Sequence, residues 1–452
     1  MNKRIIGLAL PNIITNITVP LLGMVDMAIV GHLSADHIGA IAIGTQIFNL
    51  IYWNFGFLRM GTSGFTAQAY GAGNMDEAVR IFSRAITIAI GVAAALLLLQ
   101  WPISQLALVI FDGSDRVLQL ALAYFFVRIW AAPATLGLYA IKGWFIGMQN
   151  SRLPMWIAIF LNVVNIVCSL VFVLVLHWDI RGVALGTVIA QYSGLAVGLF
   201  FLIYRYGHLF SQYRQAKRLK LKTILVDSLH WMEMRRFFKV NGDIFLRTVC
   251  LAAVFTFITA ASSRISPEIL AIDALLMQFF TLFSYIMDGF AYAGESLVGR
   301  YIGANDSQSL RLSVRLLLRW GLFLTMLFTI LYAICGEWFL RLFSNEPAVI
   351  LGARQYMFWT LIIPVCGFAA FLFDGIFVGA TASRTMRNSM FVASAAFFSI
   401  YFCGKAMLFA EQPIPDKSTW NNILWTAFMA YLALRGILQA SYLKKSVYSQ
   451  VS

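Results

Sequence analysis

The chain has 452 residues, of which 60% are hydrophobic and only 12% are charged, and its mean hydropathy is +0.78. A soluble domain carries about twice that share of charged residues, so the composition excludes an ordinary soluble protein and predicts a polytopic membrane protein. The net charge of +14 does not indicate nucleic-acid binding, because the basic residues follow a membrane topology and form no recognised nucleic-acid-binding motif.

Twelve apolar segments long enough to cross a bilayer follow one another along the chain. They lie at about 8–31, 38–57, 79–101, 117–146, 154–176, 183–204, 240–263, 269–291, 310–335, 349–381, 386–409 and 420–443. We therefore predict an all-α polytopic membrane protein with twelve transmembrane helices.

Most of the basic residues between these segments fall in alternate connections, in the set that also holds both termini. The positive-inside rule places that set, with both termini, in the cytoplasm of a multi-pass protein of the cell inner (plasma) membrane. The longest connection, 205–239, is strongly basic and is predicted to be a cytoplasmic linker near anionic lipid headgroups.

The two halves of the chain resemble each other. Gly143-Trp-Phe-Ile-Gly-Met-Gln-Asn-Ser-Arg152 matches Gly375-Ile-Phe-Val-Gly-Ala-Thr-Ala-Ser-Arg384 at an offset of 232 residues, and Gly61 matches Gly294 at 233. With six helices each, the halves form a parallel repeat related by a pseudo-two-fold axis along the membrane normal. The predicted domains are an N-terminal six-helix lobe (1–204), the basic linker (205–239) and a C-terminal six-helix lobe (240–452).

The first apolar segment holds a carboxylate, Asp26, and two prolines, Pro11 and Pro20. A charge inside a membrane helix is expensive and indicates a functional site. A proline removes a backbone hydrogen bond, so Pro11 and Pro20 are candidate hinges. Candidate partners of Asp26 in other helices of this half are Tyr139, Asn162, Asn165 and Thr187.

The second half has more charged residues within its helices, and these are candidates for lining a cavity: Asp243, Arg247, Asp288, Glu295 and Asp374. Asp243 and Arg247 are four residues apart and are expected to pair along one helix face, as a structural neutralisation. The repeat equivalent of Asp374 is Lys142, a residue of opposite charge.

Enzymatic motifs are missing from the sequence: it has no GxxxxGK[ST], HExxH or CxxC. We predict that the protein is not an enzyme and has no metal or other cofactor. Transport would then draw its energy from an ion gradient.

Several motifs resemble the multidrug and toxin extrusion (MATE) transporters, and their DinF-like branch in particular. They are Pro20 with Met24-Val-Asp26 and Val30-Gly-His32, then Gln68-Ala-Tyr-Gly-Ala-Gly73, Asn241-Gly-Asp243-Ile-Phe-Leu-Arg247 and Asp288-Gly-Phe-Ala-Tyr-Ala-Gly-Glu295. The resemblance covers nearly the whole chain.

This resemblance implies a secondary active multidrug efflux antiporter that works by alternating access on amphipathic or cationic organic compounds. In proton-coupled members an acid of the first helix works with an Asn and a Thr, which here correspond to Asp26, Asn165 and Thr187, and the first helix bends at the residue corresponding to Pro11. Relatives usually have an Asp where this chain has Ser169. That departure favours protons as the coupling ion, with sodium as the alternative. Beyond small organic substrates and the lipid bilayer no partner is expected, and the protein is predicted to be a monomer.

Other functions predict different features. A flippase or exporter of a lipid-linked or amphipathic substrate would need a strongly cationic cavity, formed for example by Arg59, Lys142 and Arg247. A membrane-embedded enzyme would need clustered catalytic or metal-binding residues at one membrane face, but the five histidines are scattered. A channel suits two parallel lobes less well than a rocking transporter.

Overall fold

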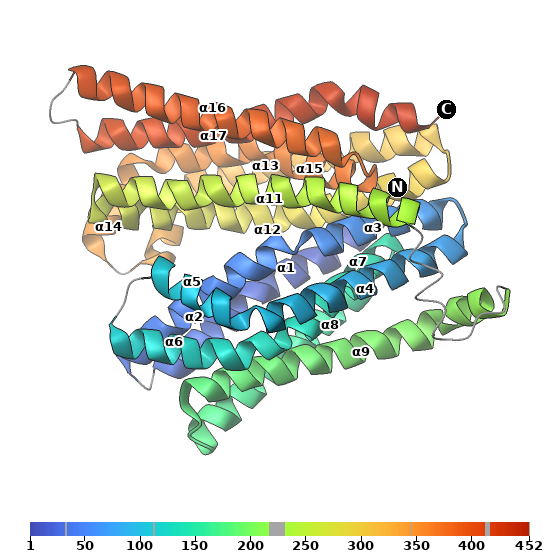
Figure 1. Ribbon diagram of the computed structural model, residues 1–452. Coiled ribbons are helices and arrows are strands. Elements are labelled where there is room, and N and C mark those ends of the chain that lie inside the picture. Colours follow the sequence, from blue (N-terminus) through green and yellow to red (C-terminus); the bar gives the residue numbers. More distant parts are fainter. Residues whose placement is uncertain (32–33, 112–113, 217–230, 345, 412–415, 452) are drawn as a thin grey trace. The chain divides into compact units, whose positions relative to one another are not determined.

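The computed structural model describes residues 1–31, 34–111, 114–216, 231–344, 346–411 and 416–451, and these contain helices and connections but no strand. The helices, labelled in Figure 1, are α1 (Asn2–Gly31), α2 (Ala35–Asn54), α3 (Phe57–Gly71), α4 (Met75–Leu98), α5 (Gln100–Ile110), α6 (Asp115–Arg128), α7 (Ala132–Gly147), α8 (Arg152–Leu170), α9 (Asp179–Ala216), α11 (Trp231–Ile265), α12 (Pro267–Gly303), α13 (Ser307–Phe343), α14 (Pro347–Gln355), α15 (Met357–Gly379), α16 (Ser383–Glu411) and α17 (Lys417–Ser446). Short turns of other helix types are η1 (Ile129–Ala131), η2 (Val171–Val175) and η3 (Tyr448–Gln450).

Within the described residues, 11 segments are long and apolar enough to cross a membrane. Two of them combine labelled helices, since α2 runs on into α3 and α6 runs through η1 into α7. Helix α1, with 30 residues, adds the first of the predicted segments and brings the number to twelve. The all-α multi-pass architecture is therefore confirmed.

The chain packs as two compact units, which we call the amino-terminal unit (Leu10–Asn241) and the carboxyl-terminal unit (Gly242–Ser452 together with Met1–Ala9). The sequence placed the first nine residues with the N-terminal lobe. In the structure Arg4 donates a hydrogen bond to the hydroxyl of Tyr301 (3.0 Å), and Trp320 Nε1 donates to Asn2 Oδ1 (3.3 Å). These contacts attach the start of α1 to the carboxyl-terminal unit.

Much of the predicted linker 205–239 is helical. Helix α9 continues to Ala216 and α11 begins at Trp231, while residues 217–230 lie outside the described part of the chain. Glu233, near the start of α11, forms ion pairs with Arg84 and, at 3.5 Å, with Arg80 of α4. The beginning of α11 is thus attached to α4 within the amino-terminal unit.

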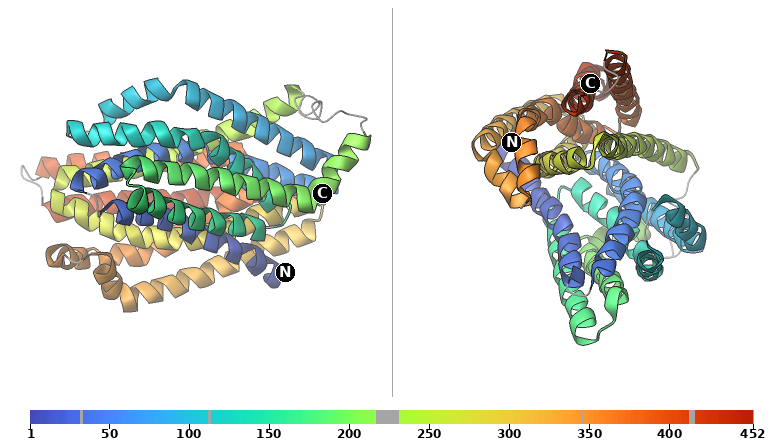
Figure 2. Two further views of the ribbon diagram at one scale, coloured as in Figure 1. Left: turned by 90° about the horizontal axis from the view of Figure 1, so that it is seen from below. Right: turned by 90° about the vertical axis from the view of Figure 1, so that its left-hand side faces the viewer.

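Each unit contains the same close helix pairs. In the amino-terminal unit α3 packs on α7 and α8 packs on α9, and in the carboxyl-terminal unit α12 packs on α15 and α16 packs on α17. Within each unit most helix axes have roughly the same orientation, as the nearly end-on view on the right of Figure 2 shows. Large aromatic side chains such as Trp144 in one unit and Tyr332 in the other fill the interior.

Two glycines show how closely the repeat is preserved. A side chain on Gly143 of α7 would collide with the backbone oxygen of Arg59, and one on Gly375 of α15 would collide with the backbone oxygen of Ala291. Both pairs are related by 232 residues. The sequence alignment matched Gly61 with Gly294 and so placed an offset of 233 in this stretch. The backbone contacts show that the offset between structurally equivalent residues here is 232.

The turns after these helices repeat as well. Four residues with left-handed backbone form two pairs at the same offset of 232: Gln149 (φ 62°) with Thr381 (φ 51°), and Gly73 (φ 68°) with Asn305 (φ 52°). The next residues, Asn74 and Asp306, each accept a backbone hydrogen bond from the first turn of the following helix, at 3.0 and 2.9 Å. Left-handed residues at equivalent positions indicate that the two units have the same chain topology.

Replacing Gly143 with alanine is expected to lower the stability of the protein by about 1–3 kcal/mol, because α7 would have to move away from α3. The matched control is Gly91→Ala on α4, where an added Cβ meets nothing within 4 Å. Thermal unfolding of the detergent-solubilised variants measures both. Equal unfolding temperatures for the two variants would contradict this account of the α3–α7 contact.

Candidate functional site

Asp26 of α1 is buried in the amino-terminal unit, with 5% of its surface exposed. The hydroxyl of Ser169, on α8, donates a long hydrogen bond of 3.4 Å to its Oδ1. Among the described residues of this unit, Asp26 is the only buried carboxylate. The sequence singled out Ser169 only as the position of an absent acid, whereas the structure makes it a direct partner of Asp26.

One turn before Ser169 on the same face of α8 lies Asn165, which is fully buried. Its Nδ2 donates to Thr187 Oγ1 of α9 at 3.0 Å, and the hydroxyl of Thr187 donates to the carbonyl of Val183 at 3.2 Å. Asn165 Oδ1 has no hydrogen-bond partner within the described residues. The site therefore holds a buried acceptor next to the turn that contacts Asp26.

The close approach of α8 and α9 depends on Gly186. A Cβ at this position would lie 2.8 Å from Ser169 Oγ and 3.0 Å from the backbone nitrogen of Ser169. The glycine therefore allows α9 to approach α8 closely enough for Asn165 and Thr187 to bond. Helix α8 thus supplies Ser169 to Asp26, and its Asn165 bonds to Thr187 of α9 one turn away.

Arg128, at the end of α6, is the functional candidate that the sequence reasoning missed. Its charge acts on Asp26, its Nη1 donates to the hydroxyl of Tyr124 at 2.5 Å, and its guanidinium lies 4.8 Å from the ring centroid of Phe48. The signal was present, because Arg128 is a cation inside an apolar segment. An acid and a base thus share the interior of this unit.

The other predicted residues of this half lie around this group. Asn162 Nδ2 donates to the carbonyl of Thr18 at 2.8 Å and so joins α8 to α1. Tyr139, on α7, is half-buried and lies close to Tyr52. Pro11 is buried in α1 and its carbonyl accepts from Thr15 at 2.9 Å. Pro20 also lies within α1, but its side chain is outside the described part.

In the carboxyl-terminal unit the predicted pairing of Asp243 with Arg247 is wrong. Asp243 instead accepts from Arg387 (2.6 Å) and Ser383 (2.8 Å) of α16, while Arg247 pairs with Asp374 of α15. Spacing along one helix permits a pair, but the partners on neighbouring helices approach in better geometry and desolvate both charges.

Asp374 is the centre of a buried network. It accepts from Arg247, from Arg435 Nη2 at 2.5 Å and from Gln439 Nε2 at 2.9 Å. Arg435 and Gln439 are neighbours on one face of α17, and both are almost fully buried. One carboxylate between two guanidinium groups leaves a net positive charge inside this unit.

The other predicted acids of this unit, Asp288 and Glu295, lie on α12, as does the buried Asp273. Glu295 is buried, with its backbone carbonyl against Gly379, and Asp288 is half-buried near Tyr285. Asp273 accepts from Ser262 (2.5 Å), Asn421 (2.9 Å) and Trp425 (2.8 Å). No group of three metal-binding side chains is found in the described ranges.

The three cations that the lipid-exporter hypothesis groups together differ in their unit and in their ion pairing. Arg59 of α3 and Lys142 of α7 lie near each other in the amino-terminal unit, and both are half-buried. Arg247 belongs to the carboxyl-terminal unit and is paired with Asp374.

The family model MatE matches residues 11–171 and again residues 244–403. The chain belongs to the MatE family. It is 37% identical to DNA damage-inducible protein F of Escherichia coli over 446 residues, which cover 97% of this chain and 91% of that protein. It is also 23% identical to the multidrug and toxin extrusion protein 1 of Homo sapiens, over 99% of this chain and 76% of that protein. In fold it matches the crystal structure of the Vibrio cholerae MATE transporter VcmN in the bent form, with a TM-score of 0.84, 17% sequence identity and coverage of 99% and 97% of the two chains.

Membership of the MatE family confirms that this is a multi-pass membrane transporter of the DinF-like branch and not an enzyme. The family model matches the chain twice at nearly the offset seen in the turns and glycine contacts. The repeat found in the sequence is thus also a repeat of the MatE unit.

Proposed function

We propose that this MatE transporter exports amphipathic and cationic organic compounds across the cell inner (plasma) membrane, as a monomer, in exchange for protons. The observation that carries the proposal is Asp26, the only buried carboxylate among the described residues of the amino-terminal unit. A titratable acid inside a membrane protein is by default part of an ion or proton pathway.

The surroundings of Asp26 suit reversible protonation. The carboxylate form accepts the hydrogen bond of Ser169, and its negative charge is offset by the positive charge of Arg128. The protonated form has a hydrogen to donate, and Asn165 Oδ1, one helical turn from Ser169, is a buried acceptor with no partner among the described residues. Each protonation state is therefore offered hydrogen-bonding groups of the right kind.

Exchange follows from charge. With Asp26 ionised, its charge and that of Arg128 offset each other, and the interior of the unit attracts an organic cation more strongly than when Asp26 is neutral. Protonation leaves the positive charge of Arg128 in excess and disfavours a bound cation. Proton binding and cation binding thus oppose each other, which an antiporter requires.

The choice of protons over sodium rests on the ligand set. Alkali and alkaline-earth cations are bound by several oxygen ligands, often more than one carboxylate. Here Ser169 stands where a second acid would be, and its hydroxyl already donates to Asp26. One carboxylate with a donor beside it is better suited to a proton than to a metal cation. The hinges proposed for the accompanying movement of α1 are Pro11 and Pro20.

Export of a lipid-linked or amphipathic anion is the second candidate, and one observation favours it. Arg59 and Lys142 lie near each other inside the amino-terminal unit, and Lys142 has no acidic partner among the described residues. The third cation of that hypothesis, Arg247, is paired with Asp374. Cation export is therefore the function that the geometry supports better.

The test is transport in proteoliposomes with the two gradients imposed separately. With a fluorescent organic cation as substrate, a proton gradient at equal sodium on both sides is expected to drive its movement against the proton flow. A sodium gradient at equal pH is expected to give no movement above that of protein-free liposomes. Transport driven by sodium alone would contradict proton coupling, and no transport of any organic cation tested under either gradient would contradict cation export.

A further inference from the structure

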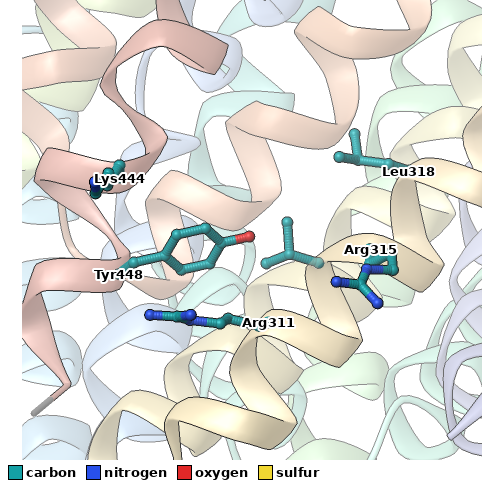
Figure 3. Close-up of a pocket in the computed structure, with 6 residues that line it drawn as sticks. Arg311, Arg315, Leu318, Lys444 and Tyr448 are labelled. Atoms are coloured by element: carbon teal, nitrogen blue, oxygen red, sulfur yellow. The ribbon is translucent and has the colours of Figure 1, made fainter.

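A pocket of about 420 Å³ lies in the carboxyl-terminal unit, between the first turns of α13 and the end of the chain. It is lined by Arg311, Val314, Arg315 and Leu318 of α13, by Lys444 of α17 and by Tyr448 of η3. Figure 3 shows the side chain of Arg311 next to the ring of Tyr448, whose hydroxyl is directed toward α13. Its volume is within the range of small-molecule sites.

Three of the six lining side chains are cationic, and none is acidic. Arg311, Arg315 and Lys444 form no ion pair with any side chain in the described ranges. The guanidinium of Arg311 instead lies 5.7 Å from the ring centroid of Tyr448. Three uncompensated cations around one concave site attract a group of concentrated negative charge, and a phosphate is the group that arginine and lysine bind best.

The pocket also has an apolar side. Val314 lines the pocket and is buried, and Leu318, which also lines it, lies one turn further along α13. The same face of α13 continues to Leu322, which is 46% exposed. A ligand with its phosphate between the cations would therefore have apolar surface along α13 for the rest of its length.

The pocket is formed by the beginning of one membrane-spanning helix and the end of another, and the ends of such helices are expected at the level of the lipid headgroups. Its cations lie at helix ends that the positive-inside rule predicts to be cytoplasmic. Tyrosine is enriched at that level, and long basic side chains reach it from within the apolar layer. The cytoplasmic leaflet carries the anionic lipids.

We infer that this pocket binds the phosphate of an anionic phospholipid, with Arg311, Arg315 and Lys444 around the phosphate and the acyl chains along α13. The site is separate from the buried side chains proposed for proton exchange, and its occupancy does not depend on transport. A free phosphate-bearing solute offers the same charged group but lacks the chains that Leu318 and Leu322 would contact.

The test compares two double variants that remove the same charge from the same two helices. Arg311→Gln with Lys444→Gln changes the lining, whereas Arg319→Gln with Lys445→Gln changes neighbouring basic residues that do not line the pocket. Binding of phosphatidylglycerol to the delipidated protein in detergent is measured by native mass spectrometry and by the rise in unfolding temperature. Phosphatidylcholine and inorganic phosphate serve as the other ligands.

Phosphatidylglycerol is expected to bind the wild type and the control variant alike, and to bind the lining variant about tenfold or more weakly. Phosphatidylcholine and inorganic phosphate are expected to produce no rise in unfolding temperature at the same concentration. Arg315→Gln alone provides a second lining variant if the double variant does not fold. Equal binding by lining and control variants would overturn the site, and a rise produced by inorganic phosphate alone would overturn its assignment to a lipid.

Discussion

Replacing Asp26 with asparagine is expected to reduce proton-driven export of organic cations to the level of protein-free liposomes while the protein stays folded. The amide has the shape of the carboxylic acid and keeps an oxygen that can accept from Ser169, so the packing of α1 against α8 is retained. It cannot bind or release a proton, so the change in net charge beside Arg128 and the exchange that depends on it would both be lost.

The measurement is dye transport under an imposed proton gradient, with the unfolding temperature as a check on folding. Asp36→Asn is the matched control, because Asp36 is in the same unit but pairs at the surface with Arg116 at 3.3 Å. The control is expected to transport at the wild-type rate. A folded Asp26→Asn variant that still exports in response to a proton gradient would remove Asp26 from the coupling mechanism.

Replacing Asp374 with asparagine is expected to destabilise the carboxyl-terminal unit by about 3–5 kcal/mol, which is the usual cost of removing one partner from a buried ion pair. The substitution leaves Arg247 and Arg435 without a counter-charge. Water cannot replace it well, because only 8% and 3% of the surfaces of these two residues are exposed. The amide group of asparagine would also turn a donor toward the two guanidinium groups.

Chemical and thermal unfolding in detergent measure this effect. Asp416→Asn is the control, since Asp416 caps α17 from an exposed position and asparagine caps a helix equally well. Adding Arg435→Gln to Asp374→Asn removes one of the uncompensated charges and is expected to restore part of the stability. If Asp374→Asn unfolds like the control, the network does not stabilise the unit.

The local pattern of the sequence predicted the architecture well. Apolar segments predicted the membrane helices, and glycines at an offset of 232 predicted the repeat. These features are readable because they depend on local physics: the thickness of a bilayer sets the length of a segment, and a close backbone approach allows only glycine. The same reasoning singled out Asp26 as the acid of the first helix.

Partners that come from distant parts of the chain were not predictable in this way. Asp374 meets Arg435 and Gln439 across 61 and 65 residues, and no spacing rule connects them. Asp243 and Arg247 had favourable spacing but found better partners on other helices. Arg128 was overlooked because it is one of 34 Lys and Arg residues. Ser169 was considered only as the position where relatives have an acid.

The division of the chain into units has a consequence for folding and ancestry. Membership changes between Ala9 and Leu10 in α1 and between Asn241 and Gly242 in α11, two places related by the same 232 residues. Before the second change, Phe237 stacks on Phe65 of the amino-terminal unit at 5.5 Å, and after it Asp243 pairs with Arg387 of the carboxyl-terminal unit. In each half of the chain, the first segment of the first helix therefore packs with the other half.

Two identical six-helix chains with this arrangement would be a domain-swapped dimer, in which each protomer completes the other. Fusion of such a pair would give the present chain, with Pro11 just beyond the first exchange point and Gly242 at the second. Neither half is then a self-sufficient folding unit. A protein cut within 217–230 should be recovered only when both pieces are produced together.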